Sequence, residues 1–239
     1  MGKLNLITVL DSRSPVSEAY RTLRTNIQFS SIDKKVQVMV VTSSVPGEGK
    51  STIAANLAVV LAESGNRTIL IDCDQRKSRQ HKIFQVSNSK GLSDILAEQC
   101  SYEDILNETD IKDLYIITTG THPPNPSELL ASEKMHSFIE KLREDFSYII
   151  LDTPPVLMVT DAQLLSGYSD GVILVASSSE VDRDAAVKAK ELLEKVNSRI
   201  LGVILNKVKL SEKGYFDRYS NYYYDSDSKH DRRKRRKLR

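Results

Sequence analysis

Residues 39–52 read MVVTSSVPGEGKST, an apolar run that passes into a glycine-containing loop and then into a helical pattern that continues to Leu61. Glycines allow backbone N–H groups to turn toward one point, and the helix that follows presents its positive N-terminal end. Lys50 can reach the outer phosphates of a nucleotide, and Ser51 offers a hydroxyl to the accompanying Mg²⁺ ion. The stretch therefore predicts a strand, a phosphate-binding loop and a helix.

The loop departs at one position from the pattern G-x-x-x-x-G-K-[ST], because the first glycine of that pattern would fall on Ser44. A dinucleotide-binding turn is disfavoured, since Gly47-x-Gly49 lacks a third glycine three residues later. A chance glycine turn between a strand and a helix is the remaining alternative. The aspartates that follow other apolar runs weaken it.

Three aspartates come directly after predicted strands. Asp72 and Asp74 follow residues 68–71, and Asp152 follows residues 148–151. A single aspartate at such a place could equally cap a helix or pair with a surface arginine. Three of them on the same sheet edge as a phosphate loop favour a magnesium and phosphoryl-transfer site, because Mg²⁺ prefers hard oxygen ligands.

Nearly all-apolar strands alternate with helical segments along the chain, which predicts an α/β, P-loop NTPase-like fold: a mostly parallel sheet with helices on both faces. In such sheets the ligand lies beyond the carboxyl ends of the strands. Asn206 follows the last strand, where it could read an adenine or simply form a turn. The predicted strands are 36–41, 68–71, 114–118, 148–151, 171–176 and 200–205, and the predicted helices are 14–27, 52–61, two short ones within 92–106, a long one from about 127 to 144, and 182–196.

Charge is unevenly distributed. The chain has 34 Lys and Arg against 32 Asp and Glu, a net charge of +2. Residues 229–239 hold eight basic residues and one acidic one, so the preceding 228 residues carry 26 basic and 31 acidic side chains, a net charge of −5. Periodicity is lost from about Ser211, which predicts a disordered tail. We expect segments at 1–35 (helical), 36–210 (P-loop core) and 211–239 (tyrosine-rich and basic tail).

Composition excludes several classes of protein. No apolar run approaches the roughly 20 residues that span a bilayer, and the N-terminus lacks the apolar core of a secretory signal. Cys73, Cys100 and the four histidines show no metal-ligand spacing, so we expect two reduced cysteines in a cytosolic protein.

The chain resembles the bacterial tyrosine kinases that phosphorylate themselves during capsule and exopolysaccharide production. The resemblance rests on four motifs, in the family's order and over the whole chain, which ends in a tyrosine-rich tail. These are Glu18-x-x-Arg21-x-x-Arg24, the phosphate loop Thr42 to Thr52, Ile69-Leu70-Ile71-Asp72-x-Asp74-x-Arg76, and Ile149-Ile150-Leu151-Asp152-Thr153-Pro154-Pro155.

The resemblance implies ATP and Mg²⁺ as cofactors and assigns roles to the site residues. Lys50 would neutralise charge on the transferred phosphoryl group, and Asp72 would accept the phenolic proton, although Asp72 and Asp74 could exchange roles. Ser51, Asp74 and Asp152 would hold Mg²⁺. The loop residues that would hold the nucleotide are Pro46, Gly47, Glu48, Gly49, Lys50, Ser51 and Thr52.

The resemblance also implies partners. Glu18, Arg21 and Arg24 would support a ring-like homo-oligomer, although a solvated helix flank is the default interpretation of such a pattern. A membrane-embedded activator with a short cytoplasmic segment and a cognate tyrosine phosphatase would act on a cytoplasmic chain recruited to the inner face of the cell membrane. The predicted phosphorylation sites are Tyr215, Tyr219, Tyr222, Tyr223 and Tyr224.

The basic arm at 229–239 lies outside the family pattern, and its role is open: such an arm is usually a solvated tail, and contact with anionic lipid is one functional option. Nucleic acid is the weaker alternative in an otherwise acidic chain. Two other functions remain open: a partitioning or septum-positioning switch ATPase, and a nucleotide-gated membrane adaptor. The switch ATPases carry a lysine early in the loop, where this chain has Val45, which argues against the first.

Overall fold

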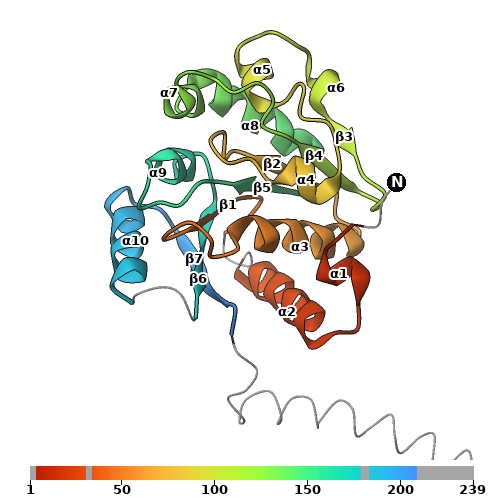
Figure 1. Ribbon diagram of the computed structural model, residues 1–239, viewed down its shortest axis with the longest axis vertical. Coiled ribbons are helices and arrows are strands. Elements are labelled where there is room, and N and C mark those ends of the chain that lie inside the picture. Colours follow the sequence, from red (N-terminus) through yellow and green to blue (C-terminus); the bar gives the residue numbers. More distant parts are fainter. Residues whose placement is uncertain (1–3, 31–33, 179–182, 209–239) are drawn as a thin grey trace, which may run out of the picture.

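The computed structural model describes residues 4–30, 34–178 and 183–208 and shows one seven-stranded sheet between two layers of helices (Figure 1). The strand order is β3-β4-β2-β5-β1-β6-β7, and every neighbouring pair is parallel except β3 with β4. The strands are β1 (Val38–Ser43), β2 (Thr68–Asp72), β3 (Asn107–Glu108), β4 (Leu114–Ile117), β5 (Tyr148–Asp152), β6 (Gly171–Ser177) and β7 (Ile200–Asn206).

Each face of the sheet has its own apolar core. Helices α1 to α4 pack on one face, and α5 to α10 pack on the other. Strands β1, β2, β5 and β6 are buried along their whole length, as a sheet covered on both sides requires. The helices are α1 (Ile7–Leu10), α2 (Pro15–Ser30), α3 (Lys50–Glu63), α4 (Gln80–Phe84), α5 (Leu92–Leu96), α6 (Tyr102–Ile105), α7 (Pro126–Leu130), α8 (Glu133–Asp145), α9 (Asp161–Ser166) and α10 (Arg183–Lys195).

The strand order places the predicted site near the middle of the sheet. β5 lies between β1 and β2, and its last residue, Asp152, is in register with Val41 of β1 and with Asp72 of β2. Because these strands are parallel, their carboxyl ends meet at one edge. The phosphate loop that follows β1 therefore lies beside both aspartates.

Helix α2 begins as its sequence predicts. Ser14 precedes Pro15 and caps the helix, since its Oγ accepts a hydrogen bond from Ser17 N at 3.1 Å. Tyr20 and Ile27 face the core, and α2 packs against α3. The amino-terminal helices thus cover the helix that follows the phosphate loop.

Several predicted elements differ from those observed. The long helix expected from about 127 to 144 is two helices, α7 and α8, because Ser132 starts a new helix by accepting from Met135 N at 3.2 Å. The first strand begins at Val38 rather than at residue 36. The sequence analysis missed four short elements, α1, α4, α9 and β3. Both cysteines are free, as expected.

Candidate active site

The loop between β1 and α3 has the conformation that its glycines predict. Gly47 and Gly49 adopt φ values of +90° and +93°, in the left-handed region that favours glycine. Ser44, where the general pattern has glycine, does not adopt a positive φ, so the serine is accommodated without backbone strain. Pro46 and Gly47 are exposed at the tip of the loop.

Two polar side chains fasten this loop to the neighbouring strands. The Glu48 carboxylate is buried and accepts hydrogen bonds from Val45 N at 2.8 Å and Ser177 N at 2.9 Å. Asn206 Nδ2 donates to the Glu48 carbonyl at 2.8 Å. A Cβ atom on Gly49 would lie 2.3 Å from Asn206 Nδ2, so this glycine is also required by close packing. Both side chains therefore set the shape of the loop.

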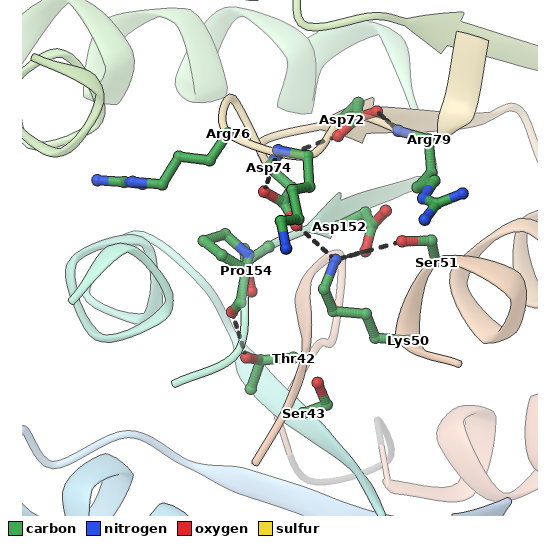
Figure 2. A network of polar contacts seen from close by, with 12 residues as sticks. Thr42, Ser43, Lys50, Ser51, Asp72, Asp74, Arg76, Arg79, Asp152 and Pro154 are labelled. Atoms are coloured by element: carbon green, nitrogen blue, oxygen red, sulfur yellow. Dashed lines mark hydrogen bonds and ion pairs between the residues drawn. The ribbon is translucent and has the colours of Figure 1, made fainter. Parts of the chain in front are cut away.

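Lys50 meets two of the predicted carboxylates (Figure 2). Its Nζ lies 2.8 Å from Asp74 Oδ2, 3.5 Å from Asp152 Oδ1 and 3.2 Å from Ser51 Oγ. The Lys50 and Ser51 residues are each 9% exposed, and Asp152 is fully buried. The sequence placed these groups on one sheet edge, and the structure brings them into direct contact.

Asp72 is held differently from its neighbour Asp74. Its Oδ2 accepts from Arg79 N and Gln80 N at 2.9 Å each, and its Oδ1 accepts from Asp74 N at 3.2 Å. The Gln80 side chain donates to Asp152 Oδ2 at 2.7 Å and to the Ser51 carbonyl at 3.1 Å. Gln80 thus links the two carboxylates to the start of α3, a role that the sequence analysis missed.

Burial and the repulsion between neighbouring carboxylates raise the pKa values of Asp72 and Asp152. Burial, reinforced by the charge of Asp152, raises the pKa of Asp72 to about 7, although the Gln80 and Arg79 N–H groups act in the opposite direction. Burial also raises the pKa of Asp152, against the opposing effect of Lys50. Burial acts to lower the pKa of Lys50, but Asp152 and Asp74 outweigh it and leave that pKa raised. A carboxyl group that titrates near neutrality beside a lysine is suited to proton transfer.

The donor set fits Mg²⁺ bound together with a nucleotide. Asp152 Oδ1 is buried and accepts no hydrogen bond, and Asp74 and Ser51 add two further hard oxygen donors. Within the described residues no group of three or more His, Cys, Asp or Glu side chains is arranged to hold a metal by itself.

A second polar cluster fixes the far side of this edge. The Arg76 guanidinium is hydrogen-bonded to the buried Asp161 at the start of α9 and to Ser127 Oγ of α7 at 3.0 Å. Ser127 Oγ donates to Asp161 Oδ1 at 2.7 Å. Three segments far apart in sequence are thereby joined. The sequence analysis found Arg76 but not its two partners.

The residues predicted for self-association lie on α2 and have partners within the chain. Arg21 pairs with Glu18 at 2.9 Å and donates to the Ser12 carbonyl, while Arg24 Nη1 donates to the Val60 carbonyl of α3 at 3.1 Å. Arg24 Nε is buried without a hydrogen bond. The five tail tyrosines and the basic arm lie outside the described residues.

Comparison with known proteins identifies the family. A family model described as AAA domain matches residues 36–207. Tyrosine-protein kinase YwqD of Bacillus subtilis (strain 168) is 43% identical over 221 residues, which cover 91% of this chain and 93% of that protein. The chain belongs to the bacterial tyrosine kinases.

Solved structures agree with this membership. The kinase resembles the chimerical protein CapA2B2 with a TM-score of 0.83 and 44% identity, over 85% of this chain and 89% of that one. It resembles the kinase domain of Escherichia coli tyrosine kinase ETK with a TM-score of 0.83 and 31% identity, over 87% and 82% of the two chains. It is therefore a protein-tyrosine kinase on a nucleotide-binding P-loop fold, as the resemblance of its motifs predicted.

The switch-ATPase alternative shares the fold at a greater distance. The septum site-determining protein MinD of Pyrococcus horikoshii, solved with Mg-ADP, matches with a TM-score of 0.63 and 26% identity, over 74% of this chain and 72% of that one. Among the described residues of the kinase, no helix is long and apolar enough to cross a membrane.

Proposed function

We propose that this kinase uses ATP and Mg²⁺ to phosphorylate the tail tyrosines of a neighbouring copy of itself, and that this reaction regulates capsular or exopolysaccharide synthesis and export. The observation that carries the proposal is the contact of Lys50 with Asp74 and Asp152, 2.8 and 3.5 Å away, beside Asp72. The sequence supplies the targets, since five of its ten tyrosines lie at residues 215–224.

The residues divide the chemistry among them. Phosphates bind the loop from Pro46 to Thr52, and Lys50 exchanges its carboxylate partners for the transferred phosphoryl group, whose charge it neutralises. Ser51, Asp74 and Asp152 would hold Mg²⁺, and the ion would supply charge neutralisation on the phosphates. The phenolic oxygen of the tyrosine bonds to the γ-phosphorus as the bond to ADP breaks, and its proton passes to Asp72. The raised pKa of Asp72 suits this residue to the role of base.

Asn206 has an additional part in this scheme. Its Nδ2 is occupied by the Glu48 carbonyl. Among the described residues no hydrogen bond to its Oδ1 is observed, and an amide oxygen is an acceptor that suits the amino group of an adenine. Asn206 would therefore combine the adenine contact with support of the phosphate loop, rather than act only as a turn residue.

Assembly and location are part of the same proposal. The kinase forms a ring-like homo-oligomer through Glu18, Arg21 and Arg24 of α2, is activated at the inner face of the cell membrane by a membrane-embedded partner, and is reset by a tyrosine phosphatase. The basic arm at 229–239 contributes contacts with anionic lipid, at about 1 kcal/mol per basic residue near a charged leaflet. The alternatives are a nucleotide switch and a membrane adaptor, neither of which forms phosphotyrosine.

The test is intact mass and phosphosite mapping of the purified chain after incubation with Mg-ATP, beside Lys50→Met. We expect a series of added phosphates on the tail tyrosines that is absent in the variant. The assay is repeated with the cytoplasmic segment of the activator. ATP hydrolysis without phosphotyrosine under both conditions would contradict the proposal and favour the switch ATPase.

A further inference from the structure

Residues 75–82, here called the basic segment, stand out against the charge of the rest of the chain. They read QRKSRQHK, with four Lys and Arg and no acidic residue. The first 228 residues as a whole carry a net charge of −5. An acidic peptide approaching the molecule would therefore be repelled over much of the surface and attracted at this segment.

The cations of the basic segment are available for a partner. Arg76, Lys77, Arg79 and Lys82 are all exposed. Arg76 is engaged by Asp161 and Ser127, but among the described residues Lys77, Arg79 and Lys82 form no salt bridge. Within the described part of the chain, these three positive side chains therefore have no acidic partner.

The basic segment is attached to the carboxylates of the site. Arg79 N and Gln80 N donate to Asp72, and Lys77 N donates to Asp74 Oδ1 at 3.0 Å. Figure 2 shows the Arg76 and Arg79 side chains extending to opposite sides of the carboxylate cluster. The segment therefore borders the place where a tyrosine must enter to reach Asp72 and the phosphoryl group.

We propose that the basic segment is a docking surface for the acidic residues beside the target tyrosines, specifically Asp225 and Asp227 in the tail of a second copy of this chain. This inference rests on the proposed function. Asp225 follows Tyr224 directly, and residues 219–228 contain two acidic residues and no basic one. Charge complementarity therefore selects this part of the tail over the strongly basic arm that follows it.

The test separates the enzyme from its substrate. The enzyme is the full chain with its five tail tyrosines changed to phenylalanine, and the substrate is the full chain carrying Lys50→Met. The initial rate of tail phosphorylation is measured against substrate concentration. Lys77→Gln with Lys82→Gln in the enzyme should raise KM about 3- to 10-fold with little change in kcat, the range expected for losing two exposed ion pairs.

A charge-coupling cycle makes the result specific. Asp225→Asn with Asp227→Asn in the substrate should raise KM by a similar factor for the parent enzyme and cause no further increase for the Lys77, Lys82 variant. Exchanging the signs, with Lys77→Glu and Lys82→Glu in the enzyme and Asp225→Lys and Asp227→Lys in the substrate, should restore most of the loss.

The matched control is Lys112→Gln with Lys188→Gln, which removes the same charge from exposed lysines elsewhere that also form no salt bridge with another described residue. It should leave KM unchanged. If the Lys77, Lys82 variant raises KM equally for both substrates, the lysines act on something other than Asp225 and Asp227, and the docking inference alone is overturned. If the parent pair transfers no phosphate even with the activator segment, the proposed function and the inference both fail.

Discussion

Asp72 and Asp74 are separated by one residue, yet their carboxylates have different surroundings. Asp72 is fully buried and accepts three backbone hydrogen bonds, whereas Asp74 forms an ion pair with Lys50. The pair is thereby divided between two tasks. In the proposed function, Asp74 would hold charge near the phosphates, and Asp72, whose pKa burial raises to about 7, would take up a proton.

The raised pKa of Asp72 predicts a pH dependence of stability. The folded chain binds a proton at Asp72 that the unfolded chain releases near pH 4, so the free energy of unfolding should fall as pH rises from about 4 to 7. The titration of Asp72 alone should lower the free energy of unfolding by roughly 4 kcal/mol over that pH range. Urea unfolding at pH 5 and pH 8 should show the wild type losing stability relative to Asp72→Asn. A difference between the two proteins that does not change with pH would contradict the prediction.

Single residues of the site were predictable to different degrees. Lys50, Ser51 and the three aspartates were found because their positions after apolar strands carry a local signal. Gln80, Ser127 and Asp161 were missed because their partners lie 29 to 85 residues away along the chain. The close approach of Asn206 to Gly49 depends on which strands are neighbours in the sheet, and the local sequence does not encode that order.

Strand β7 supports the phosphate loop through Asn206, and two loop glycines offer a matched test of that support. Gly47 and Gly49 have nearly equal positive φ, but a Cβ at Gly47 meets nothing within 4 Å, while one at Gly49 meets Asn206 at 2.3 Å. Gly47→Ala should cost about 1–2 kcal/mol of unfolding free energy through backbone strain alone. Gly49→Ala should cost about 1–3 kcal/mol more, through overpacking.

The measurement is urea unfolding of both variants, each with and without Asn206→Ala. Asn206→Ala should recover part of the loss in Gly49→Ala and none of it in Gly47→Ala, because only the first pair of residues is in contact. Equal losses of unfolding free energy in the two alanine variants would show that a Cβ at position 49 does not clash with Asn206.

Elements were predicted well where they are long and apolar. β2, β5 and β6 were found to within a residue or two, because strands buried on both faces are nearly continuous apolar runs. β7 was found equally well because its sequence is also an apolar run, although this edge strand is partly exposed. The missed helices α1, α4 and α9 have four to six residues, too few for a helical period to be visible. The break between α7 and α8 is set by the Ser132 cap, inside a run whose spacing continues across it.

At the scale of the whole molecule, we expect phosphorylation of the tail tyrosines to weaken assembly, because the added negative charge acts next to the basic arm at 229–239. Each phosphate adds about −1.5 to −2 charges, so several phosphates would offset the eight basic residues of the arm and repel an acidic body. With Mg-ATP, light scattering should show the wild type leaving the proposed ring. The variant with all five tail tyrosines changed to phenylalanine should stay assembled. Identical assembly of the two proteins would contradict this view.

Helix α3 is fixed at both ends: its first residue, Lys50, is held by carboxylates, and the carbonyl of Val60 near its other end is bonded to Arg24 of α2. The ten residue-to-residue steps from Lys50 to Val60 span about 15 Å along the helix. Twelve of the fourteen residues of α3 are buried, so the helix is clamped along its length. A helix held in this way should move as a rigid unit, so a displacement at one end should reach the other. If a neighbouring subunit displaced α2 in the proposed ring, the displacement would therefore shift Lys50, and assembly would itself adjust the residue that the proposed function assigns to the phosphoryl group.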